Sequence, residues 1–272
     1  VLYHFQGKNG IDCFPSGKGK LIYGEEILFF IFFLMWTYFA GFRPQAYGTE
    51  KFMDYGFMEA MMRSTTLPAR DLWYSEGTIN YYYGGQYFAV FLTKLTGSKV
   101  ELTYNLMRTF VAAFAFVLPF SLVRQMSVDR LKGSLTGKKR CLPAVAGIIA
   151  GLSVSIAGNM HYVVYSKIIP WLQKLQGKEA DSYWFPDATR YIGYNPDVPD
   201  KTIHEFPCYS FVLGDLHAHV VNVMFVLFLV GLLYAWMRSV RMREAVIMKP
   251  GRKQFWKKQL LIPHILLVAV MI

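Results

Sequence analysis

Five apolar stretches constrain this chain more than any other feature, because each is long enough, or nearly so, to cross a lipid bilayer as a helix. A helix needs about 20 mostly apolar residues to span roughly 30 Å of hydrocarbon. We expect crossings at residues 27–42, 102–123, 141–165, 220–237 and 259–272. With 54% hydrophobic and only 17% charged residues, the chain is too apolar for a soluble domain of its size. The predicted fold class is therefore all-α, a polytopic helical membrane protein with a single transmembrane domain and the lipid bilayer as its partner. Because the last stretch is still apolar at Ile272, we expect the chain to be part of a longer protein.

The distribution of basic residues predicts the orientation in the membrane. Segment 124–140 carries six basic residues and one acidic residue, and segment 238–258 carries eight and one. Short basic loops stay in the cytoplasm, so we expect both segments inside. Segments 43–78 and 166–207 each carry one more acidic than basic residue and are expected outside. Orientation thus accounts for the net charge of +11, and no nucleic-acid partner is predicted.

A further apolar stretch, residues 79–95, is predicted not to cross. Counting it as a crossing would invert every later segment and place both basic loops outside. The stretch is crowded with tyrosine and phenylalanine and is interrupted by Gly84 and Gly85, which suits the aromatic-rich membrane interface. We therefore expect two surface helices on the outer face, at 49–62 and 79–95. The alternative is an ordinary short crossing with an unusual charge pattern.

An acidic pair follows the first predicted crossing. Thr49 is a plausible helix N-cap, and Glu50 and Asp54 would then share one helix face, four residues apart. Two carboxylates so close repel each other, which raises one pKa unless a cation intervenes. Such a pair suits a general base or a metal ligand. Equally, early acidic residues could simply favour the helix N-terminus electrostatically.

A second polar cluster precedes the crossing at 220–237. It contains Glu205 and the run Asp215-Leu216-His217-Ala218-His219. On a helix Asp215 and His219 would converge on one cation, whereas in an extended segment Asp215, His217 and His219 would share a side. A divalent metal ion is thus one reading of this run, and interfacial hydrogen bonding is the other. Ionisable groups are energetically costly where a helix enters the membrane, which favours a functional role for this run over a structural one.

Arg108 is predicted to lie near the outer end of its helix. It could snorkel to the water, or its planar guanidinium could bind an anionic headgroup or a phosphate.

Three motifs, in this order along the chain, resemble the prokaryotic "YYY" membrane proteins. They are the runs at 50–54, 79–83 and 205–219, and the resemblance extends over about residues 43–237. It implies a location in a prokaryotic cell membrane. The chain departs from the pattern at Phe52 and Leu72, where proline is common, and at Gln86, where histidine is common. The last departure argues against a role for Gln86.

The layout also resembles the GT-C class of membrane glycosyltransferases. In that class the first outer loop carries an essential acid followed by surface helices, and the sugar donor is a polyprenyl-linked phosphate. The resemblance implies that Asp54 or Glu50 orients or deprotonates the acceptor while polyprenyl phosphate leaves. It further implies roles for three sets of residues. The phosphate would be bound by Lys51, Arg108 and Arg190, and the lipid entrance would be lined by Tyr81, Tyr82 and Tyr83. A metal ion or sugar hydroxyls would be held by Glu205, Asp215, His217 and His219.

The leading hypothesis from the sequence is therefore a GT-C-like glycosyltransferase acting on a polyprenyl-linked sugar at the outer face. Two alternatives stay open, a transporter or channel and a non-catalytic scaffold in envelope assembly. A transporter should carry polar residues through the depth of its helices. Here the polar residues gather at one face, which favours chemistry at the surface.

Overall fold

A computed structural model describes residues 19–48, 50–131, 134, 136–194 and 196–247. These residues form helices joined by loops and contain no strand, only two isolated bridges. The helices are α1 (Gly19–Gly41), α2 (Lys51–Arg63), α3 (Gly84–Thr96), α4 (Val100–Arg130), α5 (Leu142–Ser155), α6 (His161–Val163), α7 (Ile169–Leu175), α8 (Pro207–Leu213) and α9 (Ala218–Ile247), with short helical turns η1 (Gly137–Cys141), η2 (Val164–Ile168) and η3 (Phe185–Thr189). The all-α prediction is confirmed for this part of the chain.

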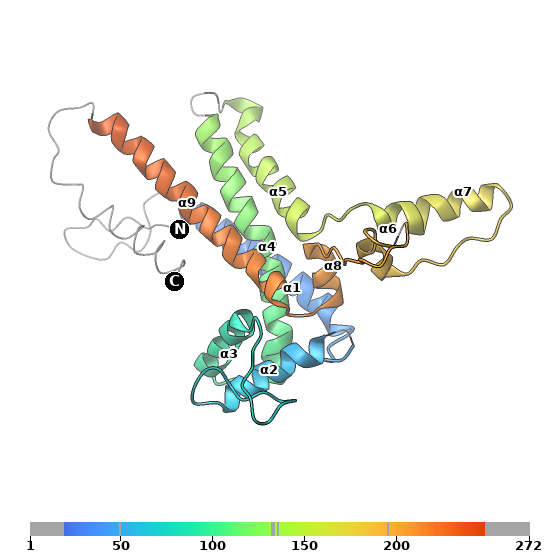
Figure 1. The fold of residues 1–272 in the computed structure, drawn as a ribbon. Helices are drawn as coiled ribbons and strands as arrows, with labels where there is room; N and C mark the ends of the chain where they lie inside the picture. Colours follow the sequence, from blue (N-terminus) through green and yellow to red (C-terminus); the bar gives the residue numbers. More distant parts are fainter. Residues whose placement is uncertain (1–18, 49, 132–133, 135, 195, 248–272) are drawn as a thin grey trace.

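The long helix α4 forms the centre of the fold and packs against α1, α5 and α9 (Figure 1). Three described helices, α1, α4 and α9, are long and apolar enough to cross a membrane. They coincide with three of the predicted crossings, 27–42, 102–123 and 220–237. The predicted crossing at 259–272 lies outside the described residues.

The packing of α5 on α4 depends on two glycines. A Cβ atom at Gly147 would lie 2.7 Å from the backbone oxygen of Phe120, and one at Gly151 would lie 2.9 Å from the backbone oxygen of Phe116. Small residues at such positions let helix backbones approach closely, the usual basis of packing between membrane helices. The two contacts also show that α5 runs antiparallel to α4.

We predict that Gly147→Ala lowers the apparent unfolding temperature in detergent, because the added methyl group collides with the backbone of α4. The free energy of unfolding should fall by about 1–3 kcal/mol. Gly231→Ala in α9 is the matched control, since a Cβ there would meet no described atom within 4 Å. Alanine favours helix over glycine, so this variant should be as stable as the parent or more so. Equal stability of the two variants would contradict the packing account.

The predicted helix over 141–165 is not continuous. Helix α5 ends at Ser155, and a break at 156–160 separates it from α6. Asn159 fixes this break, because its side chain donates to the Ala188 oxygen (2.6 Å) and accepts from the His161 backbone N–H (3.3 Å). With 14 residues, α5 rises only about 21 Å. Whether α5 crosses the membrane stays a prediction.

Helices α2 and α3 lie together at one end of α4 (Figure 1). They correspond to the surface helices predicted at 49–62 and 79–95, although α3 begins only at Gly84. Residues 79–83 precede it as a non-helical segment, tied back where the Ile79 N–H donates to the Ala69 oxygen (2.9 Å). Gly85 allows α3 to approach α9 closely, since a Cβ there would lie 2.9 Å from Val221.

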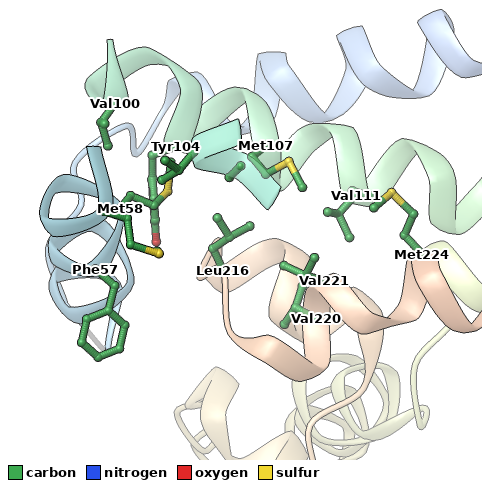
Figure 2. Close-up of a cluster of buried hydrophobic side chains, with 14 of the residues drawn as sticks. Phe57, Met58, Val100, Tyr104, Met107, Val111, Leu216, Val220, Val221 and Met224 are labelled. Carbon is green, nitrogen blue, oxygen red and sulfur yellow. The ribbon is translucent and has the colours of Figure 1, made fainter. Parts of the chain in front are cut away.

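A single apolar core joins α2, α4 and the start of α9 (Figure 2). Leu216 is fully buried at its centre and faces Met58 of α2 and Met107 of α4. Val111 and Val221, also buried, continue the core along α4 and α9. Burial of side chains this large stabilises by about 1.5–3 kcal/mol each. The core therefore fixes α2 against the loop that precedes α9.

Charged side chains gather at the two ends of α4. At the α2–α3 end, Arg108 contacts Gly214, and at the opposite end Asp129 pairs with Arg238 (2.7 Å). The 21 helical steps from residue 108 to residue 129 rise about 31 Å, close to the thickness of the hydrocarbon. The described parts of both basic segments thus lie at the end opposite α2 and α3, as the predicted orientation requires.

Candidate functional site

Six ionisable side chains from three separate segments meet at the α2–α3 end; we call them the site cluster. They are Glu50, Lys51, Asp54, Arg108, Asp215 and His217. The first three come from the start of α2, Arg108 from α4, and the last two from the loop between α8 and α9. The cluster thus brings the predicted acidic pair together with part of the predicted D-x-H-x-H run.

Asp54 is the buried centre of the cluster, with no exposed surface. Its Oδ1 accepts a hydrogen bond from Gln86 Nε2 (2.8 Å), and its Oδ2 accepts one from the Leu216 backbone N–H (3.1 Å). Gln86 Nε2 also donates to the Leu216 oxygen (3.0 Å), so both neighbours are acceptors and fix the orientation of the amide. This ring of bonds ties α2, α3 and the loop before α9 to one carboxylate.

His217 links the buried acids to the surface. Its Nε2 contacts the carboxylate of Glu50, and its Nδ1 lies 3.4 Å from Asp215 Oδ2 and 3.8 Å from Asp54 Oδ2. The Glu50 side chain is 59% exposed, whereas that of His217 is only 12% exposed. One imidazole thus stands between an exposed carboxylate and two buried ones.

Burial and neighbouring charges shift two pKa values in this group. Burial, which outweighs the neighbouring His217 and the hydrogen bonds, raises the pKa of Asp54 to about 6. The hydrogen bond to Asp215, with further help from Asp54 and Glu50, raises the pKa of His217 to about 9. At pH 7 His217 is therefore an imidazolium and Asp54 is mostly ionised.

Two buried cations lie behind the acids. Arg108 Nη1 donates to the Gly214 oxygen (3.0 Å), and Gly214 has a φ of +75°, a conformation that glycine adopts without strain. A Cβ atom at Gly214 would also lie 2.6 Å from the Arg108 guanidinium carbon. Lys51 is buried nearby, and burial, followed by repulsion from Arg108, lowers its pKa.

The predicted metal ligands separate into two groups. Asp215 and His217 belong to the site cluster, whereas His219 Nε2 bonds to Glu205 (2.9 Å), which also accepts from Ser210 Oγ (2.9 Å). The hydrogen bond from His219 lowers the pKa of Glu205. Within the described residues, no three His, Cys, Asp or Glu side chains are grouped so as to hold a metal ion. A metal ion at Glu205, Asp215, His217 and His219 stays an untested prediction.

The predicted tyrosines and Arg190 take different places. Tyr81 and Tyr82 are exposed and in ring contact with each other. Tyr81 lies near the site cluster, since burial and then Glu50 and Asp54 raise its pKa. Tyr83 packs against the core instead. Arg190 lies over the Trp184 ring (4.7 Å) and donates to the Pro186 oxygen (2.8 Å), in the segment that extends away from α2 (Figure 1).

Sequence reasoning missed Gln86 and Gly214. The departure from histidine at this position argues against a role for Gln86, yet Gln86 is fully buried and donates a hydrogen bond to Asp54. The pattern that could have indicated it is its spacing in α3, where Gln86, Ala89, Val90 and Thr93 form the buried face.

Comparison with protein families places the chain. A family model described as "Uncharacterized membrane protein (DUF2298)" matches residues 2–268. The chain belongs to this family of membrane proteins. Comparison with the curated proteins and with the solved structures gave no match. Membership supports the bilayer as the environment of the helices and the membrane as its location.

We predict that stability falls as the pH rises from about 6.5 to above 9. The raised pKa of His217 means that the folded protein holds this proton more tightly, so its ion pairs stabilise fully below pH 6.5 and are lost through pH 9. The free energy of unfolding should fall by on the order of 2 kcal/mol over this range. It is measured as the apparent unfolding temperature in detergent, and His217→Gln should remove most of the slope. An unchanged slope in this variant would contradict the pairing.

Proposed function

We propose that the chain is part of a GT-C-like glycosyltransferase that transfers a sugar from a polyprenyl-phosphate-linked donor on the outer face of a prokaryotic cell membrane. The observation that carries the proposal is the pairing of an exposed acid, Glu50, with His217 directly above the buried acid Asp54. This group follows the first membrane helix and lies beside two short helices, α2 and α3, as the resemblance implies.

Exposure divides the two acids by role. Asp54 has no exposed surface and its two oxygens are already hydrogen-bonded, so it is a positioning residue. Glu50 is open to solvent and can reach an acceptor hydroxyl. We assign Glu50 as the general base, with His217 holding its carboxylate in place.

The proposed step is an inverting displacement. The acceptor oxygen forms a bond to the anomeric carbon of the donor sugar and gives its proton to Glu50. The bond from the anomeric carbon to the phosphate oxygen breaks, and polyprenyl phosphate leaves with the electron pair. Lys51 and Arg108 are buried behind the acids, so they would stabilise the charge that develops on the phosphate through space and not by direct contact. The divalent metal ion predicted at Glu205, Asp215, His217 and His219 is not part of this step.

The neighbouring aromatic side chains suit the same substrate. Tyr81 and Tyr82 are in ring contact (5.7 Å between centroids) and both are exposed, and Tyr81 lies near Glu50. Exposed aromatic rings at a membrane interface accommodate amphipathic groups. They would line the path of the lipid-linked donor.

The distribution of charge disfavours the transporter alternative. Between Thr109 and Ser121, α4 carries no charged residue, and its charged groups lie toward the two ends. An ion path would need polar groups through that depth.

We predict that Glu50→Gln lowers transfer from polyprenyl-linked sugars by about 10²–10⁴-fold in the full-length protein in lipid vesicles, because the base is lost. Glu59→Gln is the matched control, since Glu59 lies on the same helix but pairs with Arg63 (3.4 Å) and not with the site cluster. It should retain the parent rate.

Asp54→Asn separates positioning from catalysis. It should lower the rate and also change the pH profile, because His217 loses one of its charged neighbours.

Full activity of Glu50→Gln, with unchanged unfolding temperature, would remove Glu50 from the mechanism.

A further inference from the structure

An amphipathic element extends from the bundle on the side of α5 (Figure 1). Its helical part comprises α6, η2 and α7 without interruption over residues 161–175, and we call it the arm helix. The arm helix falls partly in the predicted crossing at 141–165 and partly in the predicted outer loop. The function proposed above uses none of its residues.

The arm helix leaves a broad apolar face uncovered. Ile168, Trp171, Leu172 and Leu175 are 43%, 60%, 43% and 67% exposed. Their spacing of three and four residues places them along one side of the helix. Four large apolar residues in a row form a contiguous patch of a kind that marks contact with a membrane or another protein.

The returning chain covers the opposite side instead. Gln173 Nε2 donates to Asp181 Oδ2 (2.6 Å), and the Asp181 N–H donates to Gln173 Oε1 (3.1 Å). The segment after α7 thus binds the polar face and leaves the apolar face open. Near the start of the arm helix, His161 packs against Tyr183 and Tyr191 and closes the arm on itself.

Helix α5, which precedes the arm helix, ends about one turn short of Arg108 along α4. Gly147 and Gly151 lie against Phe120 and Phe116, so one more turn places Ser155 at the level of residue 112. Arg108 is one turn further and contacts Gly214, beside the site cluster. From this level the arm runs outward across the direction of α4 and α5 (Figure 1), which is the direction of a helix that lies in the membrane plane.

The composition of the arm helix matches the interface between lipid headgroups and hydrocarbon. Trp171 and Tyr165 are exposed aromatic residues of the kind enriched at this depth. Lys167 and Lys174 are exposed cations that can reach phosphate groups from the edge of the apolar face. An apolar face with lysines at its margin complements an anionic phospholipid surface.

We propose that the arm helix is an interfacial membrane anchor, with Ile168, Trp171, Leu172 and Leu175 buried among the phospholipids of the leaflet at the site end. The occupant of the apolar face is lipid. The anchor holds the arm, and with it the chain that returns to Glu205 and His217, at a fixed height above the bilayer.

Spin labels at two neighbouring positions test this inference. Cys13, Cys141 and Cys208 are first replaced by serine or alanine, and Leu172→Cys or Lys174→Cys is then introduced. Both positions are exposed on α7 but lie on opposite sides of it. The full-length labelled protein is placed in vesicles of phosphatidylethanolamine and phosphatidylglycerol, and collision with oxygen, which concentrates in lipid, is compared with collision with a water-soluble nickel chelate.

The label at 172 should collide several-fold more with oxygen than with the chelate, and the label at 174 should show the reverse. Equal access of the chelate to both labels would place the face in water and overturn the proposal. Protection of 172 from both reagents would assign the face to a protein partner and overturn it as well. Elution as a single folded species in detergent is required of each variant before labelling.

Discussion

The burial of the Asp54 carboxylate is the constraint on which the rest of the site depends. An ionised carboxylate without partners would be too costly to place in a site with no exposed surface. The structure meets this need with one side-chain amide from α3 and one backbone N–H from the loop before α9. Because the donors come from different segments, satisfying one carboxylate also sets the positions of those segments relative to α2.

The same arrangement sets the chemistry at the surface. Asp54 and Asp215 lie beneath His217, keep it charged, and so let it hold the exposed Glu50. Arg108 fixes the turn at Gly214 from the other side, and the turn needs glycine both for its φ and for the approach of the guanidinium. The exposed acid is thus positioned by groups that are themselves buried, which is how a polar site remains rigid beside a membrane.

Much of the fold was predictable from hydropathy and charge. The three long helices follow from runs of apolar residues. Counting charges predicts that 79–95 does not cross, and the short helix at 84–96 lies there, whereas the helix at 51–63 follows from the pattern at its start. The break after Ser155 was not predicted, because apolar residues lie on both sides of Gly158 and Asn159. The contacts of Asn159 with His161 and with the distant Ala188 hold the break. The acidic pair was predicted to lie on the same face of the membrane as Asp215 and His217, but direct contact between them was not predicted. The role of Gln86 depends on which face of α3 packs inward, and no local pattern of residues reports that hydrogen bond.

The central claim is that the start of α2 and the loop before α9 meet at one site. A short bifunctional thiol reagent tests it most directly in a cysteine-free background that carries Glu50→Cys with His217→Cys, compared with Glu59→Cys with His217→Cys. The account predicts rapid cross-linking of the first pair, because these side chains are in contact, and none of the second, because nine residues of helix move position 59 about 13 Å along α2. Equal cross-linking of both pairs, or no cross-linking of the first pair, would contradict it.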